Sequence, residues 1–140
     1  MLSLKVKRLK FILEPENEKL ISSFPEATVR GAIGYMFKHL LCCRKDRTCV
    51  SCFLNQKCIY SYLFETPLPP DSIMMRRYKS VPHPYVIYLE NKKEHLIADL
   101  TLFGHAIEQL PYFVFVFDEM AKRGLGKNRI PYFLKSVVAE

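Results

Sequence analysis

Apolar and polar side chains alternate along four stretches of the chain, and a two-residue period is typical of half-buried β-strands. The predicted strands cover residues 3–14, 85–90, 94–103 and 130–138. In the first stretch the alternation only partly holds around Val6 and Leu9, which predicts one bulge or phase slip there. The second and third stretches are separated by Asn91-Lys92-Lys93 and therefore form a predicted strand pair.

Apolar residues recur every three to four positions between residues 25 and 42, and this period predicts a helix that begins near Pro25. Its apolar positions are Val29, Ile33, Met36, Phe37, Leu40 and Leu41. Each of the two glycines inside it, Gly31 and Gly34, costs about 1 kcal/mol relative to alanine. A helix that keeps both is expected to pack closely against another backbone.

A second helix is predicted from His105 to Arg123, interrupted or restarted at Pro111 and ended by Gly124. The stretch from Ile59 to Glu65 is short, aromatic and strand-like, and residues 66–84 hold five of the nine prolines and are predicted to form a long loop. The predicted order is β-α-β-β-α-β, with an insert after the first helix. This is the α+β, ferredoxin-like arrangement of a four-stranded antiparallel sheet with two helices on one face.

The composition places the chain among ordinary globular domains. Its 140 residues, 49% hydrophobic and 25% charged, suit one domain over residues 1–140. The sequence lacks an apolar run near the ~20 residues of a membrane span, so no membrane partner is expected. The N-terminal segment interleaves charged and apolar residues, unlike a secretory signal, so a cytoplasmic protein is expected.

All five cysteines lie in the insert at residues 42–58. Two residues separate Cys49 from Cys52, which lets two thiolates reach one tetrahedral metal ion. Cys42 and Cys58 would complete the site, although spacing does not decide between Cys42 and Cys43. In a reducing compartment such clusters are metal ligands more often than disulfides, and the metal expected is a structural zinc. The alternatives are an iron–sulfur cluster and cysteines that are simply reduced.

The net charge of +7, with a pI near 9.2, favours a polyanionic partner. Basic residues gather in four patches, three of them in predicted loops, as phosphate contacts would require. One patch surrounds the pair Gly124 and Gly126, where glycine permits close backbone approach. The alternative for this pair is a helix cap followed by a turn.

Several motifs follow one another along the chain from about residue 25 to 138. They are Arg30-Gly31-Ala32-Ile33-Gly34, the spaced cysteines followed by residues 59–65, Pro84-Tyr85-Val86, Thr101-Leu102-Phe103-Gly104, and Gly124-Leu125-Gly126 with Arg129. This ordered set resembles the CRISPR-associated RAMP superfamily, whose domains are a RAMP- or RRM-like version of the ferredoxin-like fold. It is most similar to the repeat-processing endoribonucleases, the sixth CRISPR-associated protein family.

The resemblance implies that the chain binds the repeat of precursor CRISPR RNA and cuts it once, without a catalytic metal. The 2′-hydroxyl of the RNA attacks the adjacent phosphate and leaves a cyclic phosphate. Members commonly carry two such domains in tandem, and this chain is expected to hold only the first. The expected partners are therefore repeat RNA and a second RAMP domain or other CRISPR-associated proteins.

The resemblance also implies site residues, because cleavage of this kind uses a proton-transferring group, usually histidine, and a nearby cation. His39 lies on the first helix, where relatives often carry their catalytic histidine, with Tyr35 one turn before it and Lys38 beside it. His83, in a proline-flanked loop, is the second candidate. The residues expected to grip RNA are Arg76, Arg77, Lys79, Gly124, Gly126, Lys127 and Arg129.

Three functions remain open at this point. The first is an endoribonuclease, or one domain of such an enzyme. The second is a non-catalytic RAMP subunit that binds RNA and partner proteins in a CRISPR effector complex. The third is a zinc-stabilised interaction module without an RNA role, in which His39 is a partly exposed helical histidine.

Overall fold

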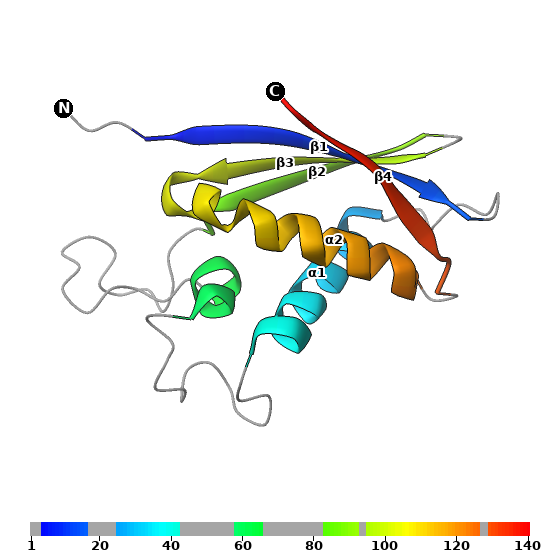
Figure 1. Ribbon diagram of the computed structural model, residues 1–140, viewed down its shortest axis with the longest axis horizontal. Coiled ribbons are helices and arrows are strands. Elements are labelled where there is room, and N and C mark those ends of the chain that lie inside the picture. Colours follow the sequence, from blue (N-terminus) through cyan, green and yellow to red (C-terminus); the bar gives the residue numbers. More distant parts are fainter. Residues whose placement is uncertain (1–3, 17–24, 43–57, 66–82, 93–94, 127–128) are drawn as a thin grey trace.

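In the computed structural model, the described residues form a four-stranded antiparallel sheet with helices against one of its faces (Figure 1). The structure describes residues 4–16, 25–42, 58–65, 83–92, 95–126 and 129–140. In chain order the elements are β1 (Val6–Pro15), α1 (Pro25–Leu41), the π-helical turn η1 (Ser61–Glu65), β2 (Tyr85–Asn91), β3 (Leu96–Phe103), the 3₁₀ helix η2 (Gly104–Gln109), α2 (Leu110–Arg123) and β4 (Tyr132–Ala139). The class is therefore α+β, as predicted.

The sheet has the strand order β2-β3-β1-β4, so β1 lies between β3 and β4. β1 pairs with β3 in continuous register from Val6 opposite Phe103 to Leu13 opposite Leu96. The phase slip predicted near Val6 is therefore wrong: Val6 simply lies on the face away from the helices. The irregularity occurs instead in β4, where Lys135 is an extra residue in the pairing with β1.

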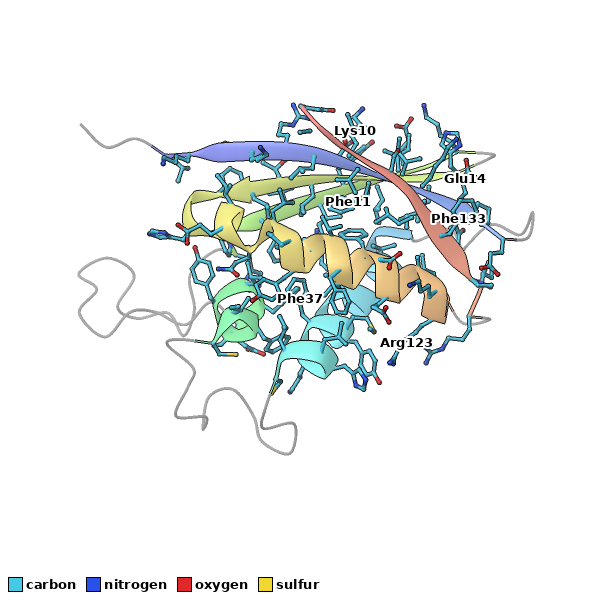
Figure 2. The ribbon with its side chains drawn as sticks, viewed as in Figure 1. Lys10, Phe11, Glu14, Phe37, Arg123 and Phe133 are labelled. Atoms are coloured by element: carbon cyan, nitrogen blue, oxygen red, sulfur yellow. The ribbon has the colours of Figure 1, made fainter. Side chains whose placement is uncertain are left out.

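The core lies between the sheet and the helices. Phe11 of β1 stacks on Phe117 of α2 with ring centroids 4.1 Å apart, and Phe37 of α1 meets Phe113 of α2 edge-on at 4.9 Å. All four rings are fully buried, and burial of each contributes roughly 1.5–3 kcal/mol. Figure 2 shows Phe11 projecting from the sheet toward α2. These contacts fix both helices on one face of the sheet.

The first helix agrees with the prediction, but its glycines have a different reason from the one expected. A Cβ added at Gly34 would meet the ring of Phe64 at 3.7 Å, and one added at Gly31 would meet nothing within 4 Å among the described residues. The predicted close approach of another backbone is therefore wrong. Gly34 leaves room for an aromatic ring, and Gly31 faces outward.

The second helix restarts where proline indicated. η2 ends at Gln109, α2 begins at Leu110, and Pro111 occupies the first turn, where its missing N–H has no intrahelical partner to lose. Gly124 ends α2 with φ +94°, a backbone conformation open mainly to glycine. None of the helices in the described part of the chain is long and apolar enough to cross a membrane.

Residues 59–65 are helical, so the strand expected there is wrong. Residues 59–60 form an α-helical turn that continues into η1. Tyr60 and Phe64 stack at 5.3 Å, which is the spacing of i and i+4 side chains on a helix, and Phe64 packs on Phe37 of α1 at 5.1 Å. Aromatic residues suit strands and helices alike, and packing against α1 decides the outcome here.

Candidate functional site

A groove of about 570 Å³ opens between α1 and the C-terminal end of α2. Its size is that of a small-molecule or nucleotide site. One wall is α1, and the other is the end of α2 with the turn that follows it. The residues that line it are Thr28, Ala32, Tyr35, Met36, Met120, Arg123, Gly124, Gly126 and Arg129.

The turn after α2 is a short hairpin built on glycine. Leu125 and Ile130 exchange two backbone hydrogen bonds of 2.8 and 2.9 Å, and the N–H of Arg129 donates to the carbonyl of Gly126 at 3.1 Å. Gly126 and Arg129 both have positive φ, at +79° and +50°. A Cβ at Gly124 would collide with the backbone carbonyl of Arg129. The glycine therefore lets the chain fold back on the helix, which brings Arg129 to the groove beside Arg123.

His39 contacts Arg123, one of the residues that line this groove. Nη2 of Arg123 lies 3.3 Å from Nε2 of His39, and Figure 2 shows Arg123 leaving the end of α2 on the side where α1 lies. A guanidinium group can only donate, so a hydrogen bond between these atoms requires Nε2 as the acceptor and the imidazole proton on Nδ1. The His39 ring also stacks on Tyr35 with centroids 5.9 Å apart and planes within 9°. Tyr35 is 60% exposed, so its ring remains open to a ligand.

The groove carries positive charge without nearby compensation. Its lining includes no aspartate or glutamate, and neither Arg123 nor Arg129 forms an ion pair with a carboxylate among the residues that the structure describes. Lys122 differs from its neighbour Arg123, because it lies 3.1 Å from Asp118. The hydrogen bond to Asp118 raises the pKa of Lys122. The unpaired arginines make the groove a favourable place for an anion.

Two predicted catalytic residues lie apart from this group. Lys38 sits with Nζ 5.7 Å from the ring centroid of Tyr60 and does not line the groove. His83 precedes β2, where its exposed ring lies parallel to Tyr85 at 6.0 Å. Burial raises the pKa of Tyr85, and the positive charge of Arg30 opposes this shift. The structure thus joins Tyr35 and His39 with the glycine hairpin, and leaves Lys38 and His83 elsewhere.

Several predicted site residues fall outside the described part of the chain. They are Cys43, Cys49, Cys52, Arg76, Arg77, Lys79 and Lys127.

The remaining two proposed metal ligands lie at the ends of two antiparallel helical segments. Gly34 of α1 lies against Phe64, whereas Lys38, one turn later, lies over Tyr60, one turn earlier. The two segments therefore run antiparallel, and the C-terminal end of α1 lies at the same end of the pair as the beginning of residues 58–65. The half-buried free cysteines at these ends are Cys42 and Cys58. No group of three or more His, Cys, Asp or Glu side chains that could hold a metal occurs within the described residues.

Arg123 belongs to the basic patch around Gly124 and Gly126, but it was not among the predicted site residues. It is separated from His39 by 84 positions, so no local pattern links the two. The available signal was its position as the last residue of a helix, directly before the glycine pair.

The geometry defines an α+β domain with a basic groove between two helices. Residues 4–140 match the family model AF_1859_N, described as an N-terminal domain, and the chain belongs to this family. Neither the curated proteins nor the solved structures searched include one that matches the chain. The description of the family names no activity, so the function has to be argued from the groove and the sequence motifs.

Proposed function

We propose that this chain binds CRISPR repeat RNA and takes part in cutting precursor CRISPR RNA without a metal, alone or as one domain of the enzyme. The observation that carries the proposal is the contact of His39 with Arg123 at 3.3 Å, beside a groove that Tyr35, Arg123 and Arg129 line. A histidine that contacts one of two arginines, neither of which pairs with a carboxylate among the described residues, suits a reaction at a phosphodiester. The link to CRISPR in particular rests on the ordered sequence motifs.

The reaction assigns a role to each of these groups. Nε2 of His39 takes the proton of the 2′-hydroxyl as its oxygen bonds to phosphorus, and the bond from phosphorus to the 5′-oxygen breaks. The products are a 2′,3′-cyclic phosphate and a 5′-hydroxyl, whose proton comes from solvent in the open groove. Arg123 and Arg129 stabilise the charge that develops on the phosphate oxygens. A phosphate held by the hairpin would place the neighbouring base near the exposed ring of Tyr35.

The proposal includes the ferredoxin-like, RAMP-type fold with a cysteine-rich insert at residues 42–58. The order β2-β3-β1-β4, with every neighbouring pair antiparallel and both long helices on one face, supports it. The family's description as an N-terminal domain supports a second domain as partner. A cytoplasmic location follows from the RNA substrate and remains part of the proposal.

A structural zinc held by Cys42, Cys49, Cys52 and Cys58 also belongs to the proposal. Its support is the antiparallel arrangement described above, in which α1 and residues 58–65 carry Cys42 and Cys58 at the same end of the two helical segments. Four thiolates would close the coordination sphere, so the metal would stabilise the insert and take no part in catalysis. Metal analysis of protein purified without chelator should find about one equivalent of zinc, and less than half an equivalent would end this idea.

One observation favours a second candidate, a non-catalytic RAMP subunit that binds RNA and partner proteins. Nε2 of His39 accepts a hydrogen bond from Arg123, so in this state its lone pair is not free to take a substrate proton.

Cleavage of labelled repeat RNA in EDTA, resolved on native and denaturing gels, tests the proposal. We expect one discrete cut that ends in a cyclic phosphate. His39→Ala should lower the cleavage rate about 10²–10⁴-fold while RNA binding persists. His105→Ala is the matched control, because His105 is an exposed histidine of η2 that lies 3.8 Å from Glu108, and this variant should cut normally. Cleavage that survives His39→Ala would refute the catalytic role, and binding without any cut would leave the second candidate.

A further inference from the structure

We propose that Arg123 is a positioning residue whose contact with His39 is controlled by phosphate. Without a ligand, Arg123 donates a hydrogen bond to Nε2 of His39. A phosphate in the groove binds Arg123 in its place, and Nε2 of His39 is then free. This inference rests on the proposed function for its purpose, but its geometry can be tested without RNA. It reconciles the histidine required for cleavage with the hydrogen bond that blocks it.

The bond between Arg123 and His39 is suited to being exchanged. Its length of 3.3 Å is at the long end for a hydrogen bond, both side chains are accessible, and the imidazole is a neutral acceptor. The net contribution of such a bond is modest, because each group exchanges it for a hydrogen bond to water. It is strong enough to hold His39 in one tautomer and weak enough to lose to a better acceptor.

A phosphate is that better acceptor. Guanidinium binds phosphate oxygens through two parallel, charge-assisted hydrogen bonds, each roughly twice as strong as a neutral one. Arg129 lines the same groove and adds a second cation. Among the residues that the structure describes, no carboxylate lines the groove to compete with phosphate for either arginine.

The exchange would make the availability of His39 as a general base depend on a phosphate bound in the groove. While the groove is empty, Nδ1 of His39 carries the proton and Nε2 is engaged by Arg123. When phosphate takes Arg123, Nε2 becomes an unoccupied acceptor beside the groove that Arg123 lines, and the stacking on Tyr35 keeps the ring in place. His39 would then accept a proton only when a phosphodiester is bound beside it.

The test is ¹⁵N NMR of the histidine side chains in the full chain at about pH 8, where an ordinary histidine is neutral. His39→Gln assigns the His39 signals. In the ligand-free protein we expect His39 to be mainly the Nδ1–H tautomer. Arg123→Gln should lose this preference, and Arg123→Lys, which keeps one charge and a donor, should retain it in part. Lys122→Gln is the matched control, because Lys122 adjoins Arg123 in the sequence but pairs with Asp118.

Titration with inorganic phosphate completes the experiment. Phosphate should move the Nε2 signal of the wild-type protein toward its position in Arg123→Gln, and Arg123→Gln should bind phosphate about tenfold more weakly. The proposal is overturned if ligand-free His39 carries its proton on Nε2, if Arg123→Gln leaves the tautomer unchanged, or if bound phosphate does not move the signal. Because no RNA is present, a protein that shows the exchange but cuts no RNA would refute the proposed function alone.

Discussion

The groove and the open face of the sheet both carry arginine or lysine beside exposed aromatic rings, yet they differ in how the charges are partnered. On the open face, Arg8 and Lys10 both lie near Glu140, at 3.7 and 3.5 Å. Lys135 lies 2.9 Å from Glu14. Figure 2 shows Lys10 on the side of the sheet opposite the helices. In the groove, the arginines lack such partners among the described residues.

The contrast teaches that an anion site is indicated by cations that lack carboxylate partners, and not by the number of cations alone. Asp99 of β3 lies opposite both Lys10 of β1 and Tyr88 of β2, so a carboxylate occupies the middle of the open face. The exposed aromatics Tyr88 and Phe133 lie on the outer strands of the sheet. A phosphate backbone would meet neutralised charge on this face and uncompensated charge in the groove. The net charge of +7 cannot make this distinction.

The largest expected effect comes from breaking the groove wall without touching the sheet face. Gly124→Ala would place a Cβ against the carbonyl of Arg129 at φ +94°, so we expect a loss of about 3 kcal/mol in the free energy of unfolding. Urea denaturation measures it. Gly126→Ala is the control, because its φ is also positive but no atom of the described residues lies within 4 Å of the added Cβ, and it should lose about 1 kcal/mol. Equal losses in the two variants would show that the close approach at Gly124 does not matter.

A smaller effect separates the two surfaces directly. The double variant Arg123→Gln/Arg129→Gln should weaken RNA binding and lower the slope of log K against log salt by about 1.4, as expected for two phosphate contacts with a single strand. Arg8→Gln/Lys10→Gln removes the same charge from the open face and should leave the slope nearly unchanged. Binding measured by fluorescence anisotropy at several salt concentrations checks both. A larger change from the sheet-face variant would reverse the assignment of the RNA surface.

The smallest expected effect tests whether the ion pairs with Glu140 are what keeps the open face of the sheet from binding RNA. Glu140→Gln removes the carboxylate near Arg8 and Lys10 while leaving the groove intact. Exposed ion pairs contribute little, so the free energy of unfolding should change by less than about 1 kcal/mol. RNA affinity should rise only slightly, through the released charge. A gain that matches the loss in the groove variant would mean that both faces bind RNA equally.

Local patterns in the sequence predicted most elements of the sheet and helices because their signals are short-range. The alternation in β1, the three-to-four period of α1 and the glycine after Arg123 each lie within one element. The helical turn at Tyr60–Phe64 was missed because its conformation depends on Phe37, which is distant in sequence. Periodicity also could not reveal that Gly34 of α1 leaves room for the ring of Phe64.

The sequence predicted local features of the candidate site, but it did not predict how α1 and α2 bring the site residues together. The four-residue spacing of Tyr35 and His39 indicated their stacking, and the glycine pair marked the hairpin. Lys38 adjoins His39 in the chain, but one residue turns the side chain by about 100° on a helix, and it contacts Tyr60 instead. The contact of Arg123 with His39 depends on how α1 and α2 pack together, and no motif in the sequence encodes that packing.

The extra residue in β4 also affects how copies of the chain meet one another. β4 is an outer strand of the sheet, and an outer strand exposes backbone groups that can pair with another chain. Lys135 interrupts the regular pairing there and places a charged side chain on the strand to which another chain would add. An ammonium group at an irregular position makes strand addition unfavourable along this border. Both features are ones by which natural sheets discourage strand addition at an edge, so we expect them to oppose aggregation along β4.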